Sequence, residues 1–239
     1  MNLYKLELIK MRLSTYLWAI LGIFASLLAL GVFFLFIFHL EAGGSGTSDE
    51  AELFTNWNGL LALTTALAFS CFSILSAAVA VKVIISEYCG KNAVILLSYP
   101  VNRKVLLGTK CLIVSGITTV SAFISNTLVI GFMYISAHIF GIMPQVITGN
   151  FLSAVLISSF LMGILSSAVG TIAAAIGWKK RSAVATIVCA LIIVCAVANC
   201  IVISPGSIIW VLSAMSGIFV LIAIFTYHVL ANGIERMEV

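Results

Sequence analysis

Side chains that commonly perform catalysis or bind metals are few in this sequence and widely separated. The three histidines lie far apart along the chain: His39, His138 and His228. Neither a His-Glu-x-x-His motif nor a Gly-x-Ser-x-Gly motif occurs. Gly90-Lys91 resembles the end of a phosphate-binding loop, but Ile85 replaces the first glycine of that motif and Asn92 replaces its Ser or Thr. The residues therefore predict no enzyme, no metal site and no cofactor in this chain.

The composition indicates where such a chain can fold. Of its 239 residues, 62% are hydrophobic and 8% are charged, whereas about 25% are charged in typical soluble proteins. The mean hydropathy is +1.24. So few polar residues cannot cover a water-soluble globule of this size, which excludes a soluble enzyme, a nucleic-acid-binding domain and a disordered linker. We expect an all-α integral membrane protein.

Intervals without charged residues predict the membrane-spanning helices, because a helix needs about 20 apolar residues to cross a bilayer. The two longest intervals are interrupted by glycine and proline at residues 138–149 and 204–207. This leaves six predicted transmembrane helices: 17–38, 57–81, 111–137, 150–177, 183–203 and 208–230. They form one domain over residues 1–239, with an interfacial segment at 1–16 and a loop at 82–110.

The basic residues predict the orientation of these helices. All 12 Lys and Arg residues fall on one side of the six-helix topology. The charged residues of the first loop on the other side are all acidic: Glu41, Asp49, Glu50 and Glu52. Because basic loops remain in the cytoplasm, both termini and the 82–110 loop are predicted to be cytoplasmic. The bases are thus topology signals rather than a nucleic-acid-binding patch.

Polar residues inside the predicted helices are neutral and mostly small. No acid or base lies in the middle of a span, which argues against an ion-coupled transporter. Asn126 either bonds to a neighbouring helix or lines a translocation path. Gly163, Gly170 and Gly177 recur every seven residues, and such a pattern lets helices approach closely, within this chain or between two copies.

The most informative segment connects the second and third predicted helices. It contains, in order, Glu87, Gly90, an apolar run at 93–97, Tyr99-Pro100, Arg103 and Lys110. This order resembles the cytoplasmic loop of permease subunits of ABC-2-type transporters. Those permeases often have Thr after the glycine, where this chain has Lys91-Asn92. Six spans with both ends inside extend the resemblance over the whole chain.

The resemblance implies an ABC-2 permease architecture similar to that of type V exporters. A separate ATPase subunit would bind ATP and Mg²⁺ and dock on the 82–110 loop, which makes Glu87, Gly90, Tyr99, Pro100, Arg103 and Lys110 the expected coupling residues. A second permease chain, identical or related, would complete the pathway in the bacterial plasma membrane. The short outer loops are most similar to those of permeases that export antimicrobial peptides, lantibiotics or related amphiphiles.

A second class of protein remains compatible with six spans. A stand-alone secondary transporter or a membrane scaffold would function without an ATPase partner. The lack of a charge in the middle of the membrane and the order of residues in the 82–110 loop both count against it. An ATPase that copurifies with the chain would separate the two classes.

Overall fold

The computed structural model describes residues 13–42, 57–85, 103–139 and 149–235, and within these ranges the chain is helical apart from short turns. The long α-helices are α2 (Leu13–Ala42), α4 (Trp57–Ala80), α7 (Arg103–Ile139), α8 (Gly149–Lys179), α9 (Ala183–Ile203) and α10 (Ile208–Glu235). A π-helical turn, η1 (Val81–Ile85), continues α4, and a 3₁₀ turn, η2 (Pro205–Ser207), precedes α10. Within the described ranges, six helices are long and apolar enough to cross a membrane, which confirms the predicted all-helical, multi-pass class.

Two helices extend into the loop that the sequence predicted at residues 82–110. Through η1, the second helix continues to Ile85, and α7 begins at Arg103 rather than at residue 111. The described part of that loop is therefore helical at both ends. The predicted boundaries differ from the observed ones because charged residues limit an apolar interval in the sequence, whereas a helix can continue through a charged residue and beyond the hydrocarbon layer.

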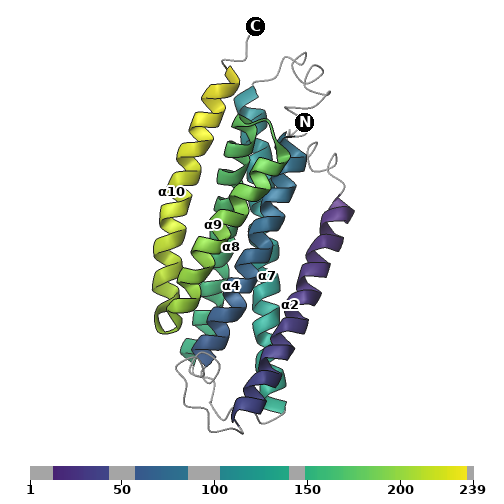
Figure 1. Cartoon of the computed structure of the whole chain (residues 1–239), viewed down its shortest axis with the longest axis vertical. Helices are drawn as coiled ribbons and strands as arrows, with labels where there is room; N and C mark the ends of the chain where they lie inside the picture. Colours follow the sequence, from purple (N-terminus) through teal and green to yellow (C-terminus); the bar gives the residue numbers. More distant parts are fainter. Residues whose placement is uncertain (1–12, 43–56, 86–102, 140–148, 236–239) are drawn as a thin grey trace.

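Successive helices run in alternating directions, so α2 begins at the end of the bundle where α10 finishes (Figure 1). Helix α8 occupies the centre and packs against α7, α10, α4 and α9. Helices α4 and α8 are the most buried, whereas α2 and α10 lie at the periphery. We call the end that holds Lys82, Lys110 and residues 179–181 the basic end.

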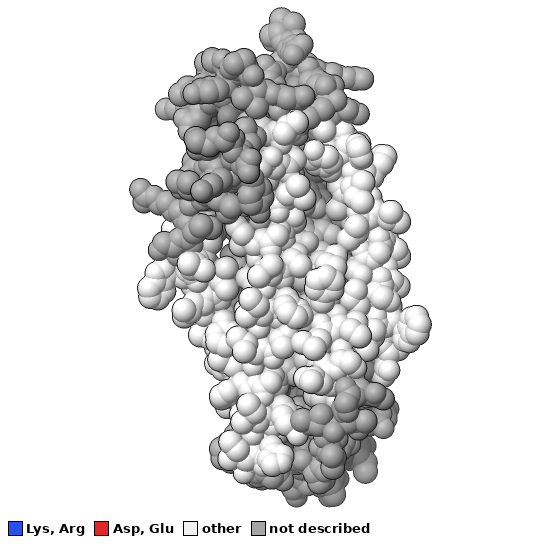
Figure 2. Space-filling model, turned by 180° about the vertical axis from the view of Figure 1, so that it is seen from behind, with Lys and Arg blue, Asp and Glu red and all other residues white. Residues whose placement is uncertain are grey.

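The outer surface of the bundle is apolar. Leu17 on α2, Ile192 on α9 and Phe225 on α10 are all more than half exposed. On the face shown in Figure 2, no Lys, Arg, Asp or Glu is visible among the described residues. Such a surface is unfavourable in water and suits the hydrocarbon of a bilayer.

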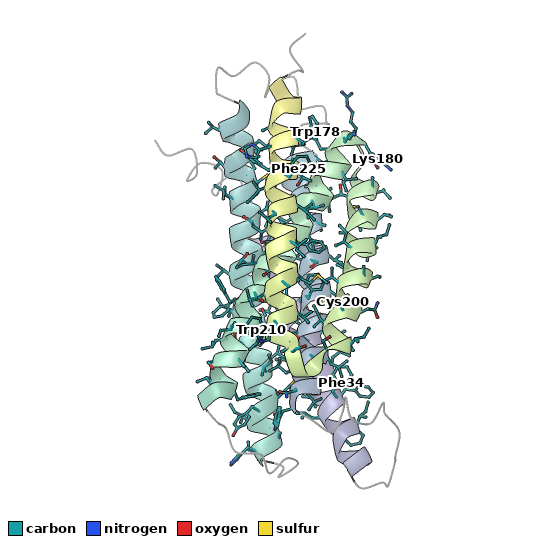
Figure 3. The ribbon with its side chains drawn as sticks, turned by 90° about the vertical axis from the view of Figure 1, so that its left-hand side faces the viewer. Phe34, Trp178, Lys180, Cys200, Trp210 and Phe225 are labelled. Atoms are coloured by element: carbon teal, nitrogen blue, oxygen red, sulfur yellow. The ribbon has the colours of Figure 1, made fainter. Side chains whose placement is uncertain are left out.

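Tryptophans lie near both ends of the bundle. Trp18 and Trp178 belong to the basic end, while Trp57 and Trp210 lie toward the other end; Figure 3 labels one of each pair. Tryptophan is enriched where hydrocarbon meets the headgroups.

The 29 residues of Phe151–Lys179 extend about 43 Å at 1.5 Å per residue, which matches a bilayer with its headgroup regions.

The turn between α8 and α9 is tight and stabilised by hydrogen bonds. Arg181 adopts a left-handed conformation with φ of 49°, which reverses the chain after α8. Ser182 then caps α9, because its hydroxyl accepts a hydrogen bond from the backbone N–H of Ala185 at 3.4 Å. Three consecutive bases, residues 179–181, are therefore held in an exposed turn at the basic end.

Candidate functional site

The predicted coupling residues fall partly on described parts of the chain. Glu87, Gly90, Tyr99 and Pro100 lie outside the described residues. Arg103 is the first residue of α7, and its side chain is also outside the description. The described structure next to these residues consists of η1 on one side and the first turns of α7 on the other.

Lys110 lies within α7 and is fully buried, with an exposed fraction of 0%. Its Nζ donates a hydrogen bond to the carbonyl oxygen of Val83 in η1 at 3.4 Å. The sequence placed Lys110 in a cytoplasmic loop, whereas the structure places it inside a helix. A buried ammonium group requires polar partners, and the π-helical turn supplies one of them.

The residues around Lys110 belong to a cluster that joins all but one of the long helices. Its buried members come from α2, α4 and its continuation η1, α7, α8 and α10, and include Tyr16, Val83, Leu107, Ala174 and Leu230. On the outside of this cluster, Lys82 Nζ lies 5.4 Å from the centroid of the Tyr16 ring, within the range of a cation–π interaction. The two helix ends that flank residues 86–102 are thus packed together and against the rest of the bundle.

Lys110 is near one end of its span rather than at the membrane centre. The apolar part of α7 extends over Val105–Ile139, so its midpoint is residue 122. Lys110 is 12 residues away, or about 18 Å at 1.5 Å per residue, and half of the hydrocarbon layer is about 15 Å thick. The buried charge therefore lies close to the headgroup level of a bilayer centred on this helix.

Asn126 forms a fully buried polar contact between α7 and α8 near the middle of α7. Its Nδ2 donates to Ser159 Oγ on α8 at 2.9 Å, and the side chain is fully buried. Its Oδ1 has no hydrogen-bond partner among the described residues, nor do the hydroxyls of Ser73 and Ser76 on α4. The interior of the bundle between α4, α7 and α8 therefore contains polar atoms that the described helices leave partly unpaired.

The three glycines of α8 each contact a different part of the chain. A Cβ atom at Gly163 would lie 2.9 Å from the backbone oxygen of Thr119 on α7. One at Gly170 would overlap Ser76 on α4, and one at Gly177 would overlap Thr186 on α9. The seven-residue stripe thus lies where α8 meets three neighbouring helices of the same chain.

Sequence reasoning missed the burial of Lys110, although a signal for it was present. Leu107, Lys110 and Val114 follow each other at spacings of three and four residues, which places them on one face of a helix. Leu107 and Val114 are buried as well.

Among the described residues there is no group of His, Cys, Asp and Glu that could hold a metal ion.

Comparisons with known proteins identify a relative but no family. The chain is 27% identical over 211 residues to the uncharacterized protein YcbO of Bacillus subtilis strain 168, and the match covers 86% of each chain. No family model and no solved structure matches this chain.

Proposed function

We propose that this chain is the membrane-spanning permease subunit of an ATP-driven ABC exporter in the bacterial plasma membrane. Both termini and the basic end face the cytoplasm. A separate ATPase subunit binds ATP and Mg²⁺, and a second permease chain, identical or related, completes the pathway. The substrates are antimicrobial peptides, lantibiotics or similar amphiphiles. The proposal combines the six apolar helices with the resemblance of residues 87–110 to an ABC-2 coupling loop.

The contact between Lys110 and Val83 is the observation that carries this proposal. Residues 86–102 connect η1 to α7, and this hydrogen bond joins those two elements directly. An ATPase that moves the connecting segment would displace the ends of α4 and α7 together. Since α4 packs against the central helix α8, the displacement would reach the core of the bundle.

Asn126 supports a pathway near the centre of the bundle. The Oδ1 of Asn126 and the hydroxyls of Ser73 and Ser76 are buried and have no hydrogen-bond partner among the described residues. A buried polar atom without a partner costs about 1–3 kcal/mol. A transport state in which α8 separates from α7 and α4 would let these atoms contact water or substrate and offset part of that cost.

The proposal is tested by purifying the chain from its native membrane, identifying any ABC ATPase that copurifies, and measuring substrate-stimulated ATP hydrolysis of the complex. Glu87→Ala and Arg103→Ala each remove a charge next to the proposed docking segment. Each should reduce stimulated hydrolysis about tenfold, the effect of losing roughly 1.5 kcal/mol from one hydrogen bond to a charged group. The amount of permease in the membrane should not change.

Lys180→Ala is the matched control, because Lys180 is exposed at the same end of the bundle but lies in the turn between α8 and α9. It should retain full stimulation. If no ATPase copurifies, or if the Glu87 and Arg103 variants behave like the control, the permease assignment is wrong. Transport by the chain alone would instead support a stand-alone transporter.

A further inference from the structure

A cavity opens between α7, α8 and α10 in the half of the bundle nearer the basic end. Its volume is about 440 Å³, which is within the usual range of ligand-binding pockets. Small residues form much of its wall on α8, including Ala168, Thr171 and Ala175. Leu112 and Ile224 line it as well and are 67% and 51% exposed, so the cavity opens to the outer surface of the bundle.

The serine and threonine hydroxyls in the cavity wall are already used within their own helices, and the wall also includes the phenol of Tyr227. Ser115 donates to the carbonyl of Leu112, and Thr171 donates to the carbonyl of Ala168 at 2.8 Å. Ser167 likewise donates to a carbonyl of its own helix. These groups have no proton left to donate to a sugar or a peptide, and the remaining wall is mainly hydrocarbon. The wall therefore suits an alkyl chain.

The position of the cavity matches one leaflet of a bilayer. From Ser167 to Ala175 its wall on α8 extends over nine residues, or about 12 Å along the helix, and one leaflet of hydrocarbon is about 15 Å thick. Lys179 follows Ala175 by one helical turn, and residues four apart are neighbours on a helix surface. Its exposed ammonium group lies at the level expected for lipid headgroups.

We propose that the cavity between α7, α8 and α10 binds one acyl chain of an anionic phospholipid from the leaflet at the basic end, with Lys179 beside the headgroup. The phosphate supplies the negative charge that complements Lys179, and the acyl chain fills the apolar wall. The inference requires only that the bundle lies in a bilayer. It does not depend on transport or on an ATPase, so its failure and that of the proposed function are distinguishable.

The test uses the full chain purified in detergent, with added dioleoyl phosphatidylglycerol or dioleoyl phosphatidylcholine and native mass spectrometry to count retained lipids. The wild type should retain phosphatidylglycerol preferentially. Ala223→Phe places a ring in the cavity from α10 and should lower retention about tenfold. Ala196→Phe is the matched control, because Ala196 is exposed on α9 and does not line the cavity.

Lys179→Gln tests the headgroup and should remove the preference for phosphatidylglycerol while retention of an acyl chain continues. Its control is Lys180→Gln, since Lys180 lies toward α9 in Figure 3.

If Ala223→Phe does not fold, Ala175→Leu fills the same cavity with a smaller side chain. Unchanged phosphatidylglycerol retention in a folded cavity-filling variant would overturn the site, as would equal retention of both lipids by the wild type. Displacement of the lipid by an amphiphilic peptide alone would identify a substrate site instead.

Discussion

At the scale of single residues, Lys110 and Asn126 are fully buried polar side chains of α7 that each donate a hydrogen bond to another element. Lys110 connects α7 to η1 near the basic end, and Asn126 connects α7 to α8 closer to the centre. Buried polar groups in a membrane protein commonly mark functional positions, so α7 is the element through which function is best probed.

Lys110→Met should separate folding from coupling. Methionine can occupy the apolar cluster around residue 110, so membrane insertion and yield should be retained. The donor to the Val83 carbonyl is lost, so substrate-stimulated ATP hydrolysis of the reconstituted complex should fall about tenfold. Lys180→Met is the control, because Lys180 is exposed at the same end of the bundle and lies outside the 82–110 loop. Full stimulation in Lys110→Met would show that this contact does not transmit the ATPase motion.

At the scale of elements, the sequence predicted the number and approximate positions of the helices because composition dominates in a membrane. The interval between Arg181 and Glu235, for example, divides at Pro205, where the structure has the turn η2. The same method placed the start of the third helix too late, since it treated Lys110 as a boundary. Lys110 limits the apolar interval in the sequence, but α7 continues through it, because its ammonium group is buried and donates a hydrogen bond to the Val83 carbonyl.

Which helices the glycines of α8 contact could not be predicted from the sequence. The seven-residue spacing indicated close approach, but it was compatible with a neighbour in the same chain or in another copy. The structure brings Gly170 against Ser76 of α4 and Gly177 against Thr186 of α9. Such contacts depend on how helices far apart in the sequence pack, and one chain's periodicity does not contain that information.

Gly170→Ala should destabilise the bundle, because the added methyl group overlaps Ser76 and forces α4 away from α8. Overpacking of this kind costs about 1–3 kcal/mol. Gly131→Ala is the matched control, since a Cβ at Gly131 meets no atom within 4 Å. Thermal unfolding in detergent, followed by size-exclusion chromatography, should show a lower midpoint for Gly170→Ala alone. Equal midpoints would mean that α4 and α8 are not packed as described.

At the scale of the whole molecule, the bundle has an apolar outer surface and two chemically different ends. Lys82 and residues 179–181 lie at one end, and Asp49, Glu50 and Glu52 lie in the sequence between α2 and α4, which are connected at the other end. Alternating helix directions bring the start of α2 and the finish of α10 to the basic end. If that end faces the cytoplasm, every segment proposed to contact the ATPase is on the correct side of the membrane.

The orientation is tested with single cysteines introduced into a variant that lacks the six native cysteines. A membrane-impermeant maleimide added to intact cells should label Ser45→Cys, which follows α2, and should not label Lys179→Cys. Permeabilised cells should label both, which confirms that each cysteine can react. Labelling of Lys179→Cys in intact cells would reverse the orientation.

The central claim is that residues 86–102 contact a separate ATPase, and photo-crosslinking in living cells tests it most directly. A photoreactive phenylalanine derivative at Tyr99 should form a crosslink to an ABC ATPase, identified by mass spectrometry of the purified product. The same derivative at Ser45, on the side predicted to be outside, should form no such crosslink. A Tyr99 crosslink to other proteins only, or a crosslink to the ATPase from both positions, would contradict the claim.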